Sequence, residues 1–92
     1  MPPTAAKLIS AVNHPLRRRI LHAYIDGSFE CASAKEVAAA LDQQVGPVAY
    51  HLKTLAQGEV LQAVPNRGWV LGVEREWLRV VLEVWVEAEV AG

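Results

Sequence analysis

The 92-residue sequence contains a single cysteine, Cys31, which excludes a disulfide framework and every metal site built from several thiolates. It also lacks an apolar run of the roughly 18 residues that a membrane-spanning helix needs. Residues 1–10 carry a lysine inside them rather than ahead of an apolar stretch, so we expect no signal peptide. Aromatic residues are few, at 7%, but apolar residues reach 52% and charged residues 21%. This composition is typical of one compact cytoplasmic domain, because a chain of this length has room for a single core.

An excess of positive charge is also missing, since nine Lys and Arg are set against ten Asp and Glu, for a net charge of −1. A nucleic-acid partner is therefore disfavoured at first sight. The charges are unevenly distributed, however. Residues 1–73 carry seven Lys or Arg against five Asp or Glu, whereas residues 74–92 carry two against five. An acidic end thus masks a mildly basic body with a net charge of +2.

Apolar periodicity and capping signals predict four short helices in the first part of the chain. They are expected at residues 4–12, at Pro15–Ile25, from Ser33 to near Asp42, and from Gly46 and Pro47 onward. Asn13 is expected to cap the second helix, and Ser33 with Glu36 matches a capping box before the third. In the fourth helix the apolar positions with helical spacing, which should face inward, are Val48, Leu52 and Leu55.

Beyond these helices the apolar pattern changes period. Val60–Val64 and Trp69–Val73 predict two short strands joined by a turn at residues 65–68. Residues 74–90 are rich in β-branched side chains, but their charged residues are three or four apart and form one polar stripe with opposite charges in reach. We therefore predict a fifth helix there.

Two short helices separated by a few residues, the second opening on proline, form a helix-turn-helix arrangement, and the hairpin that follows makes it winged. Asn13–Leu21 (NHPLRRRIL) resembles the opening helix signature of ArsR-type (arsenic-repressor-like) bacterial transcription regulators. Val45–Leu55 (VGPVAYHLKTL) resembles their recognition helix, and Gln57–Leu61 resembles the exit into the wing. The resemblance covers about residues 10–73. It implies a mainly α fold with a two-stranded β wing (α+β), that is, a winged helix-turn-helix with five helices.

The resemblance also implies an organisation and a function. The single domain of residues 1–92 would have an N-terminal helix at 1–12, a winged-helix core at 13–73 and a C-terminal dimerisation helix at 74–92. The function would be that of a homodimeric transcriptional regulator of double-stranded DNA, most simply a repressor. Its recognition helix, at about 46–57, would enter the major groove, and its wing would lie on the flanking backbone or minor groove.

The residues expected to contact DNA lie on the outward side of the predicted recognition helix, at its start and in the wing. Lys53 can pair with a phosphate, and Tyr50 offers a hydroxyl to a phosphate or a ring face to a thymine methyl group. Backbone N–H groups near Gly46 lie at a helix N-terminus, which is a favourable binding position for a phosphate. The full set is Gln44, Gly46, Pro47, Ala49, Tyr50, Lys53, Thr54, Arg67 and Arg17.

Two features of this set leave alternatives open. No Arg, Asn or Gln occupies the outward middle of the helix, and Ala49 stands where the family has serine, so base readout is expected to be modest or carried partly by DNA shape and the wing. The run Arg17–Arg19 is either a patch that contacts phosphates or the solvated side of a helix.

The last predicted helix is apolar around most of its circumference, so we expect a second copy of the chain to cover one side. Tryptophan is enriched in interface cores, which makes a dimer interface the simplest interpretation. A ligand pocket or another partner site are the alternatives. The residues assigned to the interface are Trp77, Leu78, Val81, Leu82 and Trp85.

Other chemistry is not expected. Metal-sensing relatives carry paired cysteines before the recognition helix or His, Asp and Glu sets on the terminal helix, and this chain has neither, so we expect no metal and no cofactor. His51 is expected to be packed or hydrogen-bonded, and Cys31 to be a small buried side chain rather than a redox sensor. No catalytic set is visible, which argues against an enzyme. The alternative function is a winged-helix module that binds another protein through its apolar terminal helix.

Overall fold

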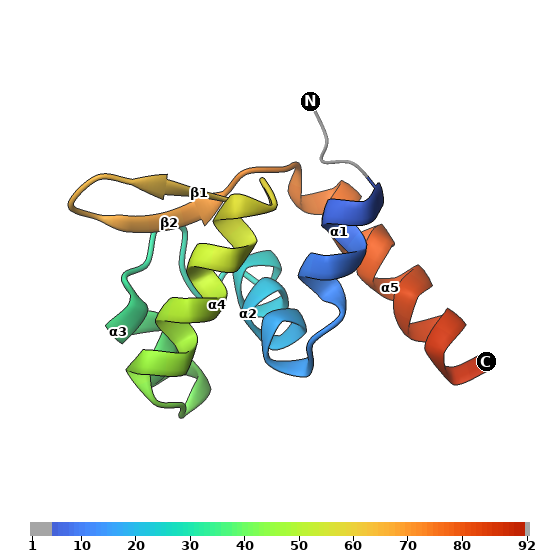
Figure 1. The fold of residues 1–92 in the computed structure, drawn as a ribbon, viewed down its shortest axis with the longest axis horizontal. Helices are drawn as coiled ribbons and strands as arrows, with labels where there is room; N and C mark the ends of the chain where they lie inside the picture. Colours follow the sequence, from blue (N-terminus) through green and yellow to red (C-terminus); the bar gives the residue numbers. More distant parts are fainter. Residues whose placement is uncertain (1–4, 92) are drawn as a thin grey trace.

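A computed structural model describes the backbone of residues 5–91 and, within that range, the side chains of residues 7–9 and 11–84. These residues form five helices and a two-stranded antiparallel hairpin, which confirms a mainly helical α+β layout (Figure 1). The elements are α1 (Ala5–Val12), α2 (Pro15–Ile25), α3 (Ala34–Leu41), α4 (Val45–Gln57), β1 (Leu61–Val64), β2 (Gly68–Leu71) and α5 (Arg75–Ala91). Every predicted helix and strand is present, with ends that agree within two residues.

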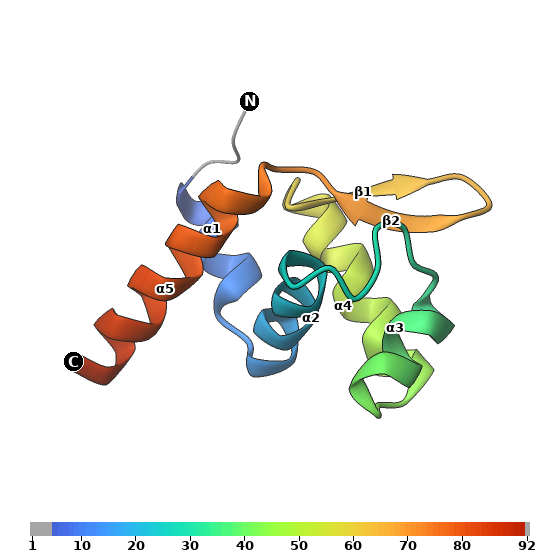
Figure 2. The same ribbon diagram turned by 180° about the vertical axis from the view of Figure 1, so that it is seen from behind.

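The core is organised around α2, which contacts all four of the other helices. α4 lies in front of α2 in Figure 1 and behind it in the reverse view of Figure 2. The hairpin and α3 occupy one end of the molecule, whereas α1 and α5 occupy the other. Ile20, Leu21 and Tyr24 of α2 are all at most 1% exposed and form the centre of the core.

The ends of the helices are set by local hydrogen bonds. The capping box before α3 is confirmed, because Glu36 N–H donates to Ser33 Oγ at 3.2 Å and Ser33 N–H donates to Glu36 Oε1 at 3.1 Å. The predicted cap of α2 is wrong: His14, not Asn13, precedes the helix, and its Nδ1 accepts from Leu16 N–H at 3.1 Å. The histidine has the extended backbone of a cap residue and places a ring nitrogen where a capping oxygen normally lies.

α4 begins two residues earlier than predicted, at Val45 rather than at Pro47. A proline is tolerated throughout the first turn of a helix, because the N–H groups there have no partner within the helix. Pro47 therefore marks the first turn of α4 but not its first residue.

The hairpin pairs Leu61 with Leu71 and Val64 with Gly68 across a tight turn in which Asn66 has a left-handed φ of 65°. The segment before α3 adds a bridge to it. Ala32 and Trp69 exchange two backbone hydrogen bonds, of 3.1 and 2.9 Å. Gly68 makes this approach possible, because a Cβ atom there would overlap the Ala32 carbonyl group.

Tyr24 fastens the hairpin to the helical body. Its hydroxyl group donates to the Trp69 carbonyl oxygen at 2.7 Å, and its ring packs edge-on against Phe29 with centroids 4.6 Å apart. Three effects raise the pKa of the Tyr24 phenol well above its usual range. Burial is the largest, and the charges of Cys31 and Glu36 add to it. The phenol is therefore a permanent hydrogen-bond donor at neutral pH.

α5 packs against α2, and this contact corrects part of the predicted dimer interface. Leu78 and Leu82 are fully buried in the core of the single chain, so they are not available to a second copy. Trp77 and Val81 are half-buried, and the side chain of Trp85 lies outside the described residues. The apolar side chains that α5 leaves exposed among the described residues are Val80 and Val84, at 55% and 59%.

Candidate nucleic-acid interface

α4 divides its side chains between the core and the solvent. Val48, Leu52 and Leu55 are fully buried, as predicted, because α4 packs on α2, α3 and β1. Tyr50 is 63% exposed, and Lys53, one turn further along, is exposed as well. The stripe of α4 that carries Tyr50 and Lys53 is therefore accessible to solvent.

The other predicted contact residues of α4 are accessible to different degrees. Gly46 and Pro47 are exposed at the start of the helix, whereas Ala49 and Thr54 are half-buried at the edges of the stripe. Thr54 Oγ1 donates to the Tyr50 carbonyl oxygen at 3.0 Å, so its proton is used within the helix. In this rotamer the Thr54 hydroxyl can only accept, and it offers no donor to a phosphate oxygen.

The start of α4 is left without a side-chain cap. Gln44 occupies the capping position and is exposed, but its side chain makes no hydrogen bond to the first turn. The backbone N–H groups of Val45 and Gly46 point out of the helix end together with the positive end of its dipole. This arrangement suits an anion such as a DNA phosphate.

An acidic side chain lies near this helix end. Asp42 has a left-handed backbone with a φ of 53° and lines a shallow hollow of about 450 Å³ together with Gln43, Gln44 and Pro47. Its carboxylate disfavours a phosphate within the same hollow. A phosphate at the start of α4 would therefore sit toward Gly46 rather than toward Asp42.

His51 forms a packed cluster beneath the exposed stripe. It is 7% exposed, its ring lies 4.3 Å from the ring of His14, and Tyr50 meets it edge-on at 5.4 Å. Arg17 Nε donates to His51 Nδ1 at 3.1 Å. Burial, followed by the charges of His14 and Arg17, lowers the pKa of His51, so the ring is neutral at pH 7 and carries its proton on Nε2. The prediction of a packed, hydrogen-bonded His51 is confirmed.

The three consecutive arginines of α2 bind three different neighbours. Arg17 reaches His51 of α4, Arg18 Nη1 donates to the Val12 carbonyl oxygen of α1 at 2.7 Å, and Arg19 Nη2 donates to the Leu41 carbonyl oxygen of α3 at 3.1 Å. Arg17 and Arg18 are half-buried and Arg19 is exposed, so the run as a whole is not the solvated helix side that was one of its two alternatives.

Arg67 lies in the hairpin turn and is exposed, as predicted for the tip of a wing. Arg67, Lys53 and Arg17 are thus predicted contact residues that come from three different elements, the hairpin turn, α4 and α2. Arg19 is exposed and belongs to the run Arg17–Arg19, but it is not in the predicted set of DNA-contact residues, and it binds the last carbonyl of α3. The contact between Arg19 and the Leu41 carbonyl group can be recognised only from the packing of α2 against α3, because the two residues are 22 positions apart in the sequence.

No cluster of three or more His, Cys, Asp or Glu that could hold a metal ion occurs among the described residues. Within the same part of the chain, no helix combines the length and the apolar character needed to cross a membrane. Comparison of the sequence with models of known protein families and with curated proteins finds no match.

Proposed function

We propose that the chain is a winged helix-turn-helix protein that binds double-stranded DNA, with α3 and α4 as the helix-turn-helix, α4 as the recognition helix and the β1–β2 hairpin as the wing. The observation that carries this proposal is the division of α4. Its apolar stripe is fully buried while Tyr50 and Lys53 remain accessible, next to a hairpin that presents Arg67. A helix held in this way offers its outer face to the major groove without loss of core packing.

The proposed contacts are of two kinds: contacts with phosphates, which position the protein on DNA, and contacts with bases, which read the sequence. Lys53, Arg67 and the backbone N–H groups at Val45 and Gly46 suit phosphates, which fix the register of the protein but carry no base sequence. Tyr50 is the exposed aromatic side chain in the middle of the α4 stripe, where it suits contact with base edges or a thymine methyl group. With few amide or guanidinium groups on the outer face of α4, we expect moderate sequence specificity.

We further propose that the DNA-binding form is a homodimer and that it acts as a repressor by occupying its operator. The exposed Val80 and Val84 of α5 and Ile9 of α1 support a second copy, since α1 and α5 lie at the same end of the molecule (Figure 1). The interface would then use this exposed side rather than the buried Leu78 and Leu82. The two recognition helices of such a dimer would address half-sites about 34–36 Å apart.

A fluorescence-anisotropy titration on labelled duplex DNA tests the proposal. We expect binding whose affinity falls steeply with rising salt, because phosphate contacts release counterions. Arg67→Ala should weaken binding to all sequences alike, because a phosphate contact carries no base sequence. Absence of binding at about 50 mM salt would refute DNA binding, and an affinity independent of salt would refute the proposed phosphate contacts.

A second candidate function is a module that binds another protein through α5. It is favoured by the same exposed valines, Val80 and Val84, and by the acidic C-terminal region, where five Glu outnumber two Arg over residues 74–92. Size-exclusion chromatography with light scattering separates the two. A stable homodimer agrees with the DNA-binding proposal, and a monomer or a heterogeneous aggregate favours the protein-binding module.

A further inference from the structure

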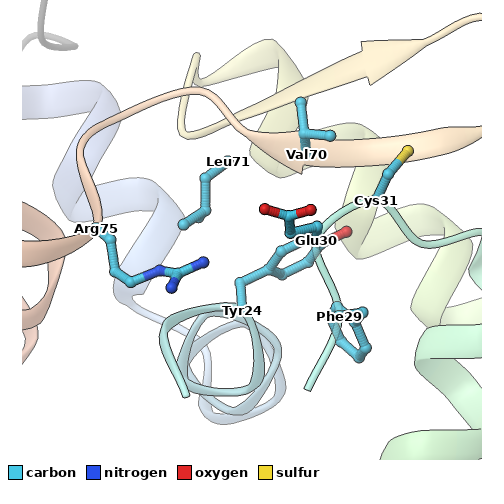
Figure 3. Close-up of a pocket in the computed structure, with 7 residues that line it drawn as sticks. All are labelled: Tyr24, Phe29, Glu30, Cys31, Val70, Leu71 and Arg75. Carbon is cyan, nitrogen blue, oxygen red and sulfur yellow. The ribbon is translucent and has the colours of Figure 1, made fainter. Parts of the chain in front are cut away.

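A hollow of about 290 Å³ opens between α2, the segment before α3, β2 and the first residue of α5 (Figure 3). None of the proposed DNA-contact residues lines it. The side chains that give it its chemistry are Tyr24, Phe29, Glu30, Cys31, Leu71 and Arg75. Liquid water takes about 30 Å³ per molecule, so the hollow has room for a ligand of about ten non-hydrogen atoms.

The hollow carries two opposite charges over an apolar wall. In Figure 3 the guanidinium group of Arg75 and the carboxylate of Glu30 extend from different elements toward the same space. Neither side chain makes an ion pair or a side-chain hydrogen bond with any residue that the structure describes. Tyr24 is 1% exposed and its hydroxyl group binds the Trp69 carbonyl oxygen, so it supports the hollow from beneath rather than binding a ligand. The accessible apolar wall comes from the half-buried Phe29, Val70 and Leu71.

We propose that this hollow binds a small zwitterion of the α-amino-acid class with an apolar side chain. The carboxylate of the ligand would pair with Arg75, which suits bidentate binding, and its ammonium group would donate to Glu30. Its side chain would lie against the aromatic and aliphatic wall. An inorganic anion would satisfy only Arg75, and a cation only Glu30, so a molecule that carries both charges fits the pair best.

The position of the hollow also connects two parts of the fold. β2 and the first residue of α5 both line it, and the neighbouring Trp69 carbonyl is the point where Tyr24 holds the hairpin. A bound ligand would therefore brace the base of the hairpin against α5. Binding of the ligand to the hollow can nevertheless be measured in the absence of DNA.

Isothermal titration calorimetry of the full chain with L-valine, L-leucine, L-methionine and L-phenylalanine tests the proposal. We expect at least one of them to bind with a Kd between about 10 μM and 5 mM, the range open to so small a ligand. The matched analogues are the amide and the N-acetyl derivative of the amino acid that binds, which lack one charge each. We expect each analogue to bind at least about tenfold more weakly.

The protein variants Arg75→Gln and Glu30→Gln remove one charge each from the hollow. Both side chains are exposed, so the fold should be retained, as circular dichroism would verify. We expect each variant to weaken binding about tenfold or more. Arg79→Gln is the matched control, because Arg79 also lies on α5 but pairs with Glu76 and does not line the hollow.

Cys31 provides a second, independent measurement. It is the only cysteine of the chain, it is half-buried and it lines the hollow, so the rate of its alkylation by iodoacetamide reports occupancy. We expect a saturating amino acid to slow this reaction in the unchanged protein and not in Glu30→Gln.

Four results would each overturn the proposal: no binding of any of the four amino acids up to about 20 mM, equal binding of the analogues that lack one charge, binding unchanged in both variants, or no protection of Cys31. None of these measurements uses DNA. A failure here therefore leaves the proposed DNA binding intact, and a failure to bind DNA leaves this site intact.

Discussion

The hydrogen bond from Tyr24 to the Trp69 carbonyl oxygen predicts a measurable loss of stability in Tyr24→Phe. The change removes one hydroxyl group and keeps the buried ring and its edge-on contact with Phe29. A net hydrogen bond contributes about 1 kcal/mol, and the Trp69 oxygen keeps its bond from the Ala32 N–H, so no acceptor is left unpaired. We expect a loss of about 1 kcal/mol, which for a domain of this size lowers Tm by about 4–8 °C.

Urea and thermal denaturation followed by circular dichroism measure this loss, with Tyr50→Phe as the matched control. Tyr50 is 63% exposed, so removing its hydroxyl group should change stability by less than about 0.5 kcal/mol. Equal Tm values for Tyr24→Phe and the control would refute the role of the bond. A loss above about 3 kcal/mol would also refute the reasoning, because it would require repacking of the core.

The same phenol predicts a dependence on alkaline pH. Burial raises the pKa of Tyr24 in the folded protein above the value near 10 that it has in the unfolded chain. The contribution of this group to stability is therefore complete below pH 10 and declines as the pH rises further, because the unfolded chain then loses a proton that the folded protein keeps. The urea midpoint of Tyr24→Phe should fall less steeply above pH 10 than that of the unchanged protein, and parallel curves would contradict this.

Three further predictions concern the interface and the hairpin. Lys53→Ala should weaken binding to all DNA sequences and reduce the slope of log K against log[salt] by about one, measured by anisotropy. Burial lowers the pKa of His51 in the folded protein below its unfolded value near 6.5. The contribution of His51 to stability is therefore present above pH 6.5 and is lost as the pH falls further, because the unfolded chain then binds a proton that the folded protein does not. The urea midpoints at pH 7.5 and pH 5.5 should accordingly differ less in His51→Gln than in the unchanged protein. Gly68→Ala should cost several kcal/mol in urea denaturation, because its Cβ would overlap the Ala32 backbone, whereas Gly27→Ala, with open space around it, should cost about 1 kcal/mol.

Local signals explain why the helices could be predicted from the sequence. Ser33 and Glu36 form a capping box from side chains only three residues apart, and the inward positions of α4 follow from helical spacing alone. The spacing of its charged residues predicts α5 as a helix despite its β-branched composition, and the i,i+3 ion pair of Arg79 with Glu76 belongs to that stripe. Information of this kind lies within one or two turns of chain.

The features that could not be predicted depend on contacts between distant segments. The bridge between Ala32 and Trp69 joins residues far apart in the sequence, and nothing in the residues around Ala32 indicates a strand partner. The burial of Leu78 and Leu82 follows from how α5 packs on α2, which periodicity does not determine for a helix that is apolar on most sides. The exposed side of α5 could therefore be assigned only once its packing was known.

The arginine run shows how this affects the proposed interface. A run of cations was expected to face either phosphate or water, but Arg17, Arg18 and Arg19 each bind an acceptor on a different helix, so they hold α2 to its neighbours. Loss of DNA binding on substitution of Arg17 would therefore be ambiguous, because the bond that fixes His51 beneath α4 would be lost as well. Lys53 and Arg67 are exposed and make no side-chain hydrogen bond or ion pair with the residues that the structure describes. Their substitution tests the electrostatic contribution to DNA binding without disturbing the fold.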